Sequence, residues 1–388
     1  MTNEFELLRS LARPALETSH AARARAAAAR GVDWDAFQSL AWRHGLMPLA
    51  CGHLLGSLAD LVPDGAREKM RADFRHNAAR NLWLASELCA MLDALGSRGV
   101  EALPLKGPAL AVQLYGDAKL RSFVDLDLLV RPRDARRAGE VLASMGFRPH
   151  LRLSAAQEAM LSRSECDRVY LREGRNLMCE LHWAVTPPYF SVPLSTDEIF
   201  SDLTDIALCG RSVRVPSDET TLVVLCVNGA KDLWLSLEHV CAVAELVRSR
   251  PNLNWERAAE LSERAGARRI LLLGLRLART LLDAPLPESV GARVDADAEV
   301  ESLAEEASVR MARAEAAEPG VWEKTSFRVR ARERVSDRAR YCALRLFTPT
   351  YKDCAISLPR PLSFVYYGVR VARLVRAGVR RQAAGPVL

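Results

Sequence analysis

The sequence predicts an α+β protein in which a small mixed-sheet core is flanked by helical regions. Three observations support this. Residues 1–99 are rich in alanine and leucine at helical spacing, the chain then changes to short alternating runs that are typical of strands, and the helical spacing later returns. We therefore divide the chain into an N-terminal helical region (1–99), an α/β core (100–215), a helical domain (216–322) and a basic C-terminal helical extension (323–388).

Both helical regions rest on the same periodic pattern. In the first, apolar residues from Trp34 to Ala41 are spaced as on one face of a helix, and leucines between residues 82 and 95 repeat this spacing. In the later part of the chain, residues 220–247 and 255–283 show it again. These segments are therefore predicted to be amphipathic helices that pack through one apolar face.

The core contains short elements of both kinds, and glycines and prolines mark the turns between them. A hairpin combined with helical connections predicts a mixed sheet. The predicted elements are a strand in VEALPLKG, a helix in ALAVQLYGD, a strand in SFVDLDLLV, an amphipathic helix in DARRAGEVLASMGF that ends at Gly146, and antiparallel strands over residues 168–173 and 176–185.

Cysteine usage and hydropathy favour a cytoplasmic location. The nine cysteines are scattered, odd in number and never arranged as C-x-x-C, which argues for reduced thiols and against a disulfide framework or a zinc site. The first residues, MTNEFELLRSLARP, contain acidic residues and lack the apolar run of a secretory signal. No stretch approaches the eighteen consecutive apolar residues that a membrane-spanning helix requires.

Positive charge is concentrated near the C-terminus. Residues 324–388 carry 15 Lys/Arg and 3 Asp/Glu, a net charge of +12, whereas residues 1–323 sum to −6. Residues 363–381 predict a basic amphipathic helix, which can lie on an anionic membrane or a polyanionic partner, or equally pack its apolar stripe on the body of the protein. Its apolar stripe consists of Phe364, Tyr367, Val371, Leu374 and Val375, and its basic side of Arg370, Arg373, Arg376, Arg380 and Arg381.

The strongest candidate for chemistry is a pair of aspartates. Asp125 and Asp127 are two residues apart on a predicted strand, so both side chains leave the same face. Two carboxylates this close repel each other by about 4 kcal/mol at an effective dielectric constant near 20. A raised pKa, a basic neighbour or a divalent cation must offset this repulsion, and oxygen ligands suit Mg²⁺, or Mn²⁺, better than zinc. An isolated D-x-D also occurs on solvated strand faces, so the neighbouring residues must show whether this pair binds a metal.

The surroundings of the pair favour a phosphate and metal site. Lys106 and Gly107 stand at a predicted strand-to-helix turn, where glycine lets the backbone approach a phosphate and the helix start offers free N–H groups. Downstream, Glu180 and His182 share one face of a predicted strand. If that strand lies beside the strand of Asp125, the carboxylates of Asp125, Asp127 and Glu180 converge on one point. Such a cluster is able to hold the two metal ions that catalyse phosphoryl transfer in many enzymes.

These residues carry a resemblance to a known family. The run LPLKGPALAVQLYGDAKLRSFVDLDLLVRPRD, with ELHW at 180–183 and NGAKDLW at 228–234, resembles the uncharacterised bacterial nucleotidyltransferase family of the polymerase-beta-like superfamily. The resemblance implies Mg²⁺-dependent transfer of a nucleotidyl group from an NTP to a hydroxyl acceptor, with release of pyrophosphate. It covers nearly the whole chain, but only the 103–134 block and ELHW are specific.

The resemblance also implies a role for each matching residue. His182 is interpreted as a substrate-binding residue or base, or else as a structural histidine. Asp125 and Asp127 would bind the metal, and Glu180 would either bind it or act as the base toward the acceptor hydroxyl. Gly107 and Lys231 would contact the triphosphate. Lys106 and Arg121 would neutralise phosphate charge, or Arg121 would instead form a structural bond to the aspartate pair.

Four positions depart from the pattern, and they leave the acceptor side open. Pro108 stands where the superfamily usually has Ser, Asn228 and Asp232 replace histidines, and Ala242 replaces an Asp. Three alternatives to a general nucleotidyltransferase therefore stay open. They are a toxin-like enzyme that acts on tRNA or protein, a tailoring enzyme for a peptide or glycan, and a non-catalytic nucleotide-binding module.

Overall fold

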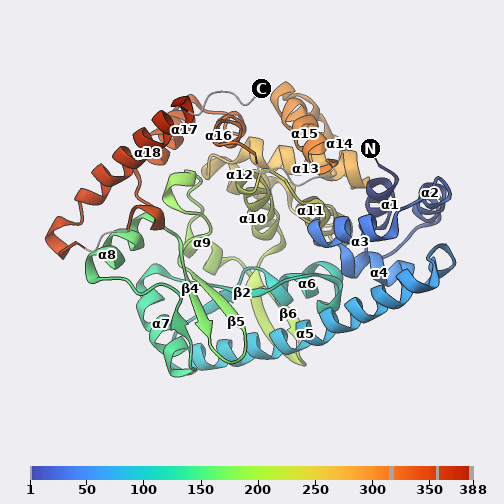
Figure 1. The fold of residues 1–388 in the computed structure, drawn as a ribbon, viewed down its shortest axis with the longest axis horizontal. Coiled ribbons are helices and arrows are strands. Elements are labelled where there is room, and N and C mark those ends of the chain that lie inside the picture. The colour runs from blue at the N-terminus through green and yellow to red at the C-terminus, as the bar shows by residue number, and fades with distance from the viewer. Residues whose placement is uncertain (1, 314–318, 355–357, 384–388) are drawn as a thin grey trace.

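The computed structural model of the protein describes residues 2–313, 319–354 and 358–383, and it has the predicted α+β class. A five-stranded sheet lies on one side of the molecule, with helices packed around it and a large helical layer beyond (Figure 1). The strand order is β1-β2-β5-β4-β3. The strands are β1 (Ala102–Pro104), β2 (Asp125–Val130), β3 (Arg148–Pro149), β4 (Asp167–Arg172) and β5 (Leu177–His182).

The sheet is mixed, as predicted. The two central strands, β2 and β5, are parallel, and their register pairs Asp127 with Glu180. Strand β1 is antiparallel to β2, β4 is antiparallel to β5, and β3 is antiparallel to β4. Because β2 and β5 are neighbours, side chains that project from the same face of both strands lie side by side.

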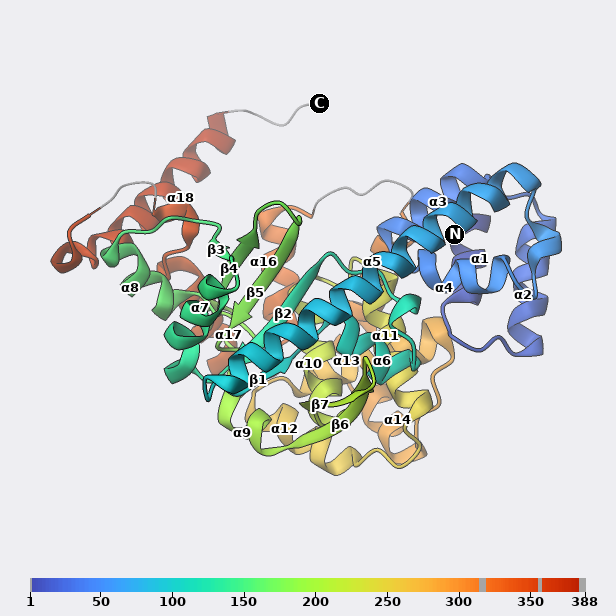
Figure 2. The ribbon, with the colours of Figure 1, turned by 90° about the horizontal axis from the view of Figure 1, so that it is seen from below.

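One face of the sheet is apolar and covered by helices. Leu126, Leu128 and Val130 alternate along β2 with the two aspartates, and they pack with Cys179 and Leu181 of β5 in one buried cluster. The 34-residue helix α5 (Asp64–Ser97) runs along this face, as Figure 2 shows, and α7 (Ala135–Ser144) packs beside it. The opposite face of β2 and β5 carries the carboxylates.

The sheet has a companion hairpin that the sequence analysis did not predict. Strands β6 (Leu203–Leu208) and β7 (Arg211–Pro216) are antiparallel, and Leu208, Val213 and Val215 join the apolar cluster beneath the large sheet. Cys209 and Gly210 form the connection, both with positive φ, as a two-residue hairpin turn of the primed type requires. The remaining core helices are α6 (Gly107–Tyr115), α8 (Ala155–Ser164) and α9 (Thr196–Ser201), with short 3-10 turns η2 (Ala118–Leu120), η3 (Pro132–Asp134) and η4 (Pro188–Phe190).

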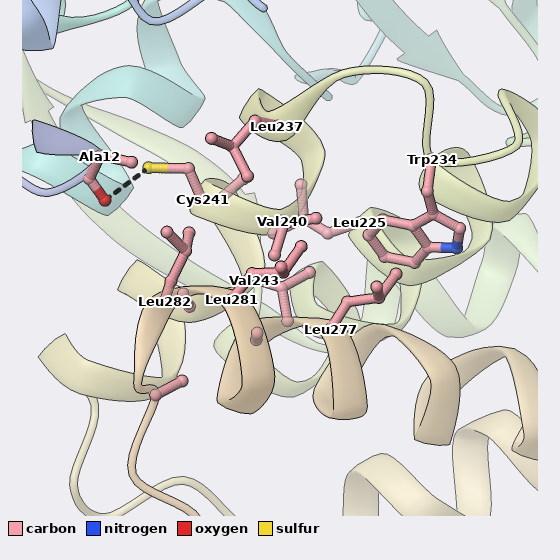
Figure 3. Close-up of a cluster of buried hydrophobic side chains, with 14 of the residues drawn as sticks. Ala12, Leu225, Trp234, Leu237, Val240, Cys241, Val243, Leu277, Leu281 and Leu282 are labelled. Atoms are coloured by element: carbon pink, nitrogen blue, oxygen red, sulfur yellow. Dashed lines mark hydrogen bonds between the residues drawn. The ribbon is translucent and has the colours of Figure 1, made fainter. Parts of the chain in front are cut away.

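The N-terminal helices and the later helical domain share one hydrophobic core. Figure 3 shows part of it, where Trp234, Val240 and Leu277 interdigitate. The Sγ of Cys241 donates a hydrogen bond to the carbonyl oxygen of Ala12 at 3.3 Å, which ties the two parts together. The contributing helices are α1 (Asn3–Leu11), α2 (Thr18–Ala29), α3 (Trp34–Arg43), α4 (Met47–Leu54), α10 (Asp218–Lys231), α11 (Leu237–Ser249), α12 (Trp255–Arg264), α13 (Arg268–Leu282), α14 (Glu288–Asp295) and α15 (Ala298–Met311), with the 3-10 turn η1 (Ala59–Leu61) following α4.

The C-terminal extension folds back across the core as α16 (Val321–Arg330), α17 (Val335–Phe347) and α18 (Val365–Ala383), with short turns η5 (Tyr351–Asp353) and η6 (Arg360–Leu362). The apolar stripe of α18 is not packed on the body as one of the two alternatives expected, and binding to an anionic membrane or polyanion stays a prediction. Phe364, Tyr367 and Val375 are exposed, whereas Arg370 and Arg373 turn inward to Asp353. The side chains of residues 377–388, and hence Arg380 and Arg381 of the predicted basic side, lie outside the described residues. Within the described part of the chain, no helix is long and apolar enough to cross a membrane.

Candidate active site

Three carboxylates project from one face of two adjacent strands. Asp125 and Asp127 lie on β2, and Glu180 lies on β5 directly across from Asp127. The alternation of the strands puts these side chains opposite Leu126 and Leu128, whose burial fixes the orientation of the whole strand. The apolar residues that hold β2 in the sheet therefore also orient the side chains of the two aspartates toward the opposite face.

His182 lies between two of these carboxylates. Its Nε2 is 3.1 Å from Oδ1 of Asp127 and 3.4 Å from Oε2 of Glu180. Burial alone would lower the pKa of His182, but its hydrogen bonds to Asp127, Cys166 and Glu180 raise that pKa well above its ordinary value. These contacts favour the protonated imidazole, and its Nε2 lies between the two carboxylates. The ligand atoms of Asp127, Glu180 and His182 all lie within 4.8 Å of one another, which is a spacing that a metal ion can bridge.

Lys106 supplies the second positive charge. Its Nζ lies 3.5 Å from Oδ1 of Asp127, which itself is only 4% exposed. Burial would raise the pKa of Asp127, but Lys106 and His182 together hold it well below its usual range. Asp127 is thus ionised throughout the physiological range.

Asp125 is the carboxyl whose charge is least compensated. Burial, followed by repulsion from Asp127 and Glu180, raises the pKa of Asp125 to about 6. The pKa of Glu180, by contrast, is lowered because His182 hydrogen-bonds to it. The two aspartates of the pair thus differ widely in pKa, although they lie on the same strand face.

The turn before α6 brings backbone N–H groups to the same region. Gly107 is the first residue of α6 and has φ of 62°, in the left-handed region that favours glycine. A Cβ at this position would lie 3.5 Å from the carbonyl oxygen of Asp125, which is ordinary contact, so conformation rather than space requires the glycine. The first turn of α6 therefore starts beside the aspartate strand, with its free N–H groups available to an anion.

Arg121 lies near the site, but its direct partner is a residue that the sequence analysis did not identify. Its Nε donates a hydrogen bond to Oε1 of Glu238, from α11, at 2.5 Å. The loop that carries Arg121 is fixed by α5, because the Nδ2 of Asn81 donates to the carbonyl oxygens of Ala118 and Arg121 at 2.8 and 2.7 Å. Arg121 thus stabilises the ionised aspartates by electrostatic attraction at a distance rather than by a direct hydrogen bond.

The Arg121–Glu238 pair should be a substantial contributor to stability. Glu238→Gln leaves the largely buried guanidinium of Arg121 without a counter-charge, and we expect the free energy of unfolding to fall by about 3 kcal/mol. Urea denaturation measures this change. The exposed Glu256 on α12 provides the matched control, and equal midpoints for Glu238→Gln and Glu256→Gln would contradict the expectation.

The loop between α10 and α11 closes another side of the site. Lys231 ends α10, and within the described residues its side chain has no ion pair or hydrogen bond. The next residue, Asp232, raises the pKa of Lys106 together with Asp127, although burial opposes this rise. His239 of α11 lies 3.7 Å from Asp232. The motif NGAKDLW predicts that Lys231 belongs to the site, but the pairing of Asp232 with His239 depends on how the helices pack.

A further acidic group lies behind His182. Cys166, Asp167 and His182 have ligand atoms within 4.8 Å of one another, and Glu165 precedes them. Burial, and then repulsion from Asp167, raises the pKa of Glu165 to about 7. The folded state therefore holds a proton on Glu165 that the unfolded chain loses at lower pH.

This raised pKa predicts a pH-dependent effect on stability. A carboxyl with a raised pKa in the folded state does not lower the free energy of unfolding at low pH, where it is protonated. It lowers that free energy as the pH rises through the raised pKa. We expect Glu165→Gln to be more stable than the wild type by about 2 kcal/mol at pH 8 and indistinguishable at pH 5. Urea unfolding at both pH values, with the exposed Glu173→Gln as the control, measures the difference. A gain of equal size at both pH values would rule out ionisation of Glu165 as the cause.

A hollow in the surface lies away from these carboxylates. It has a volume of about 690 Å³ and is lined by α7, α8 and the face of β4 and β5 that carries Tyr170, Leu181 and Trp183. Because side chains alternate along a strand, this is the face opposite Glu180 and His182. The hollow is therefore separate from the carboxylate cluster.

A mixed sheet with clustered carboxylates beside a glycine turn at a helix start is the arrangement of the nucleotidyltransferase class. A family model described as uncharacterised nucleotidyltransferase matches residues 30–283, more than half of the chain. The chain belongs to this family, which confirms the resemblance stated from the sequence and supports a general nucleotidyl transfer activity.

Comparison with other proteins adds little detail. The solved structure of an antigenic nucleotidyltransferase-like protein from Paracoccidioides brasiliensis is similar over 53% of this chain and 94% of that chain, with 15% sequence identity and a TM-score of 0.33. None of the curated proteins matches the chain. The substrates and the roles of individual residues must therefore be argued from this chain itself rather than from a relative.

Proposed function

We propose that the protein transfers a nucleotidyl group from an NTP to a hydroxyl group of an acceptor and releases pyrophosphate, with Mg²⁺ as its cofactor. The observation that carries this proposal is the meeting of Asp125, Asp127 and Glu180 on one face of two parallel neighbouring strands. Family membership supports the transfer chemistry, and the donor set of the site supports the cofactor.

The residues at this site fit a divalent cation. The pKa of Asp125 is raised first by burial and then by repulsion from Asp127 and Glu180, and a divalent cation bound by these carboxylates would offset that repulsion. Asp127 and Glu180 belong to a group whose ligand atoms lie within 4.8 Å of one another, and together with Asp125 on the same sheet face they offer the oxygen ligands that Mg²⁺ and Mn²⁺ prefer. When bound, the metal would promote ionisation of the attacking hydroxyl and stabilise charge on the leaving pyrophosphate.

The reaction itself is an in-line displacement. The acceptor oxygen forms a bond to the α-phosphorus, the bond from that phosphorus to the bridging oxygen breaks, and pyrophosphate departs with the electron pair. Glu180 is ionised, so it is able to accept the proton of the acceptor hydroxyl. His182 carries its own proton and positions Glu180 and Asp127 rather than acting as a base.

The triphosphate would lie against the start of α6. Gly107 gives this turn its backbone conformation, and the free N–H groups of the first turn, to which Pro108 contributes none, would face a bound anion. Lys106, which lies beside Asp127, and Lys231, at the end of α10, would neutralise phosphate charge. Arg121, held by Glu238, adds positive potential at a fixed position.

The proposal is tested by incubating the protein with each α-labelled NTP, Mg²⁺ and a lysate of the source cells. We expect one or more labelled acceptors, together with released pyrophosphate, and the identity of the labelled molecule separates RNA, peptide and glycan acceptors. Isothermal titration with each NTP and Mg²⁺ accompanies the assay. NTP binding without turnover would point to a non-catalytic nucleotide-binding module, and the absence of both would overturn the proposal.

A further inference from the structure

The C-terminal extension, which lies beyond the family match, packs against the segment that follows the Glu180 strand. That segment is η4, and its two aromatic rings are covered by arginines from α16, α17 and the loop between them. The guanidinium of Arg345 lies 5.5 Å from the ring centre of Tyr189. Those of Arg328 and Arg332 lie 5.9 and 4.8 Å from the ring centre of Phe190.

These three arginines have no carboxylate partners within the described ranges. Arg328 donates a hydrogen bond to the carbonyl oxygen of Lys231, and Arg332 donates to that of Phe190. The side chain of Arg345 donates no hydrogen bond to any described residue. Arg332 is 1% exposed and its Nε has no partner. By contrast, the nearby Arg310 and Arg330 are each paired with two glutamates, so the absence of counter-charges is local to this cluster.

Two of these guanidinium groups lie over the rings of adjacent residues, Arg345 over Tyr189 and Arg328 over Phe190. The pKa of Tyr189 is raised to about 12 by burial and by Glu165, whereas Arg345 and Arg328 both act to lower it. The phenol therefore stays protonated at neutral pH and is able to donate a hydrogen bond. Burial and repulsion from Asp167 raise the pKa of the neighbouring acid Glu165 to about 7, which weakens its ability to balance the charges of the arginines.

This positive cluster borders the candidate active site on two sides. Cys166 contributes to the pKa of Tyr189 and also lies within 4.8 Å of the ring nitrogen of His182, which contacts Glu180. On the other side, Arg328 bonds to the backbone of Lys231, beside the loop residue that faces Lys106. The cluster therefore lies next to the reaction centre rather than on a remote surface.

We propose that Tyr189, Arg328 and Arg345 bind a phosphate group of a substrate, so that the C-terminal extension completes the substrate site. This proposal rests on the proposed nucleotidyl transfer for its substrate. Guanidinium groups bind phosphate oxygens through charge-assisted hydrogen bonds, and a neutral phenol adds a third donor. The phosphate belongs either to the triphosphate of the NTP or to a phosphorylated acceptor.

The test measures binding rather than turnover. Arg345→Gln is the best variant, because it removes no hydrogen bond donated by this side chain to a described residue, and the exposed Arg340→Gln on the same helix is its matched control. Isothermal titration uses the α,β-methylene analogue of each NTP with Mg²⁺, and then inorganic phosphate with the analogue-saturated protein. We expect about tenfold weaker binding of one of these two probes to Arg345→Gln, and less than a twofold change for Arg340→Gln.

Each outcome has a separate meaning. Weaker binding of the analogue assigns the cluster to the triphosphate, and weaker binding of inorganic phosphate alone assigns it to the acceptor. If Arg345→Gln, Arg328→Gln and Tyr189→Phe, all folded by circular dichroism, bind both probes like Arg340→Gln, the proposal is overturned. Partial recovery in Arg345→Lys would support a charge contact. A wild type that binds inorganic phosphate through Arg345 but transfers no nucleotide would overturn the proposed function alone.

Discussion

Asp125→Asn and Asp127→Asn are each expected to lower the rate of nucleotidyl transfer by about 1000-fold, which corresponds to about 4 kcal/mol of lost transition-state stabilisation. The substitution keeps the size of each side chain and removes the negative charge that would hold the metal. Because Asp127 also faces Lys106 and His182, its loss leaves two cations facing each other across the site. Pyrophosphate release from the labelled NTP measures the rate.

The control for these variants is Asp205→Asn, in the β6–β7 hairpin. Asp205 is exposed, and its hydrogen bond from the hydroxyl of Ser212 survives in asparagine. Its activity should equal that of the wild type, and all three variants should retain wild-type circular dichroism. Full turnover in both Asp125→Asn and Asp127→Asn would remove these residues from the reaction and the metal site with them.

Trp234→Ala is expected to cause the largest loss of stability, about 3–5 kcal/mol. The indole is fully buried in the shared helical core of Figure 3 and fits against two glycines. A Cβ at Gly229 or Gly274 would lie 2.6 or 3.0 Å from its ring, so the surrounding backbone is shaped to this side chain. Truncation leaves a cavity that neighbouring helices cannot fill without shifting.

Denaturant unfolding of Trp234→Ala, compared with Trp322→Ala, isolates this packing effect. Trp322 is 82% exposed on α16, so its removal should leave the unfolding midpoint unchanged. Because the two variants lose the same side chain, a similar decrease in both would show that burial in the helical core is not the source of the loss.

The sequence was sufficient to predict the local part of the site. The alternation in SFVDLDLLV placed Asp125 and Asp127 on one face, and the structure has β2 there with the apolar residues on the other face. The mixed sheet and the fold class were likewise predicted, because hairpins and glycine turns are encoded by neighbouring residues. The β6–β7 hairpin was missed, although the alternation of TDIALCGRSVRV around Cys-Gly could have revealed it.

Contacts between distant segments could not be predicted in this way. Arg121 and Glu238 are 117 residues apart, and nothing in either local pattern specifies that they meet. For α18, periodicity correctly groups residues by side but does not say which side meets the body. Arg370 faces inward because Asp353, from a preceding turn, offers a buried counter-charge. Long-range partners of this kind depend on how the elements pack, which a single sequence does not reveal.

The shared helical core implies that the limits of the family match are not limits of folding. The match begins at residue 30, yet Phe5, Leu8 and Leu11 of α1 are at most 1% exposed and lie within the same core as Trp234. A chain begun at residue 30 would lose α1 and uncover an apolar surface on α3 and α13, which predicts aggregation. The sheet is thus inserted in the sequence between two helical parts that fold together as one body. The protein should therefore be produced with both helical parts, including residues 2–29.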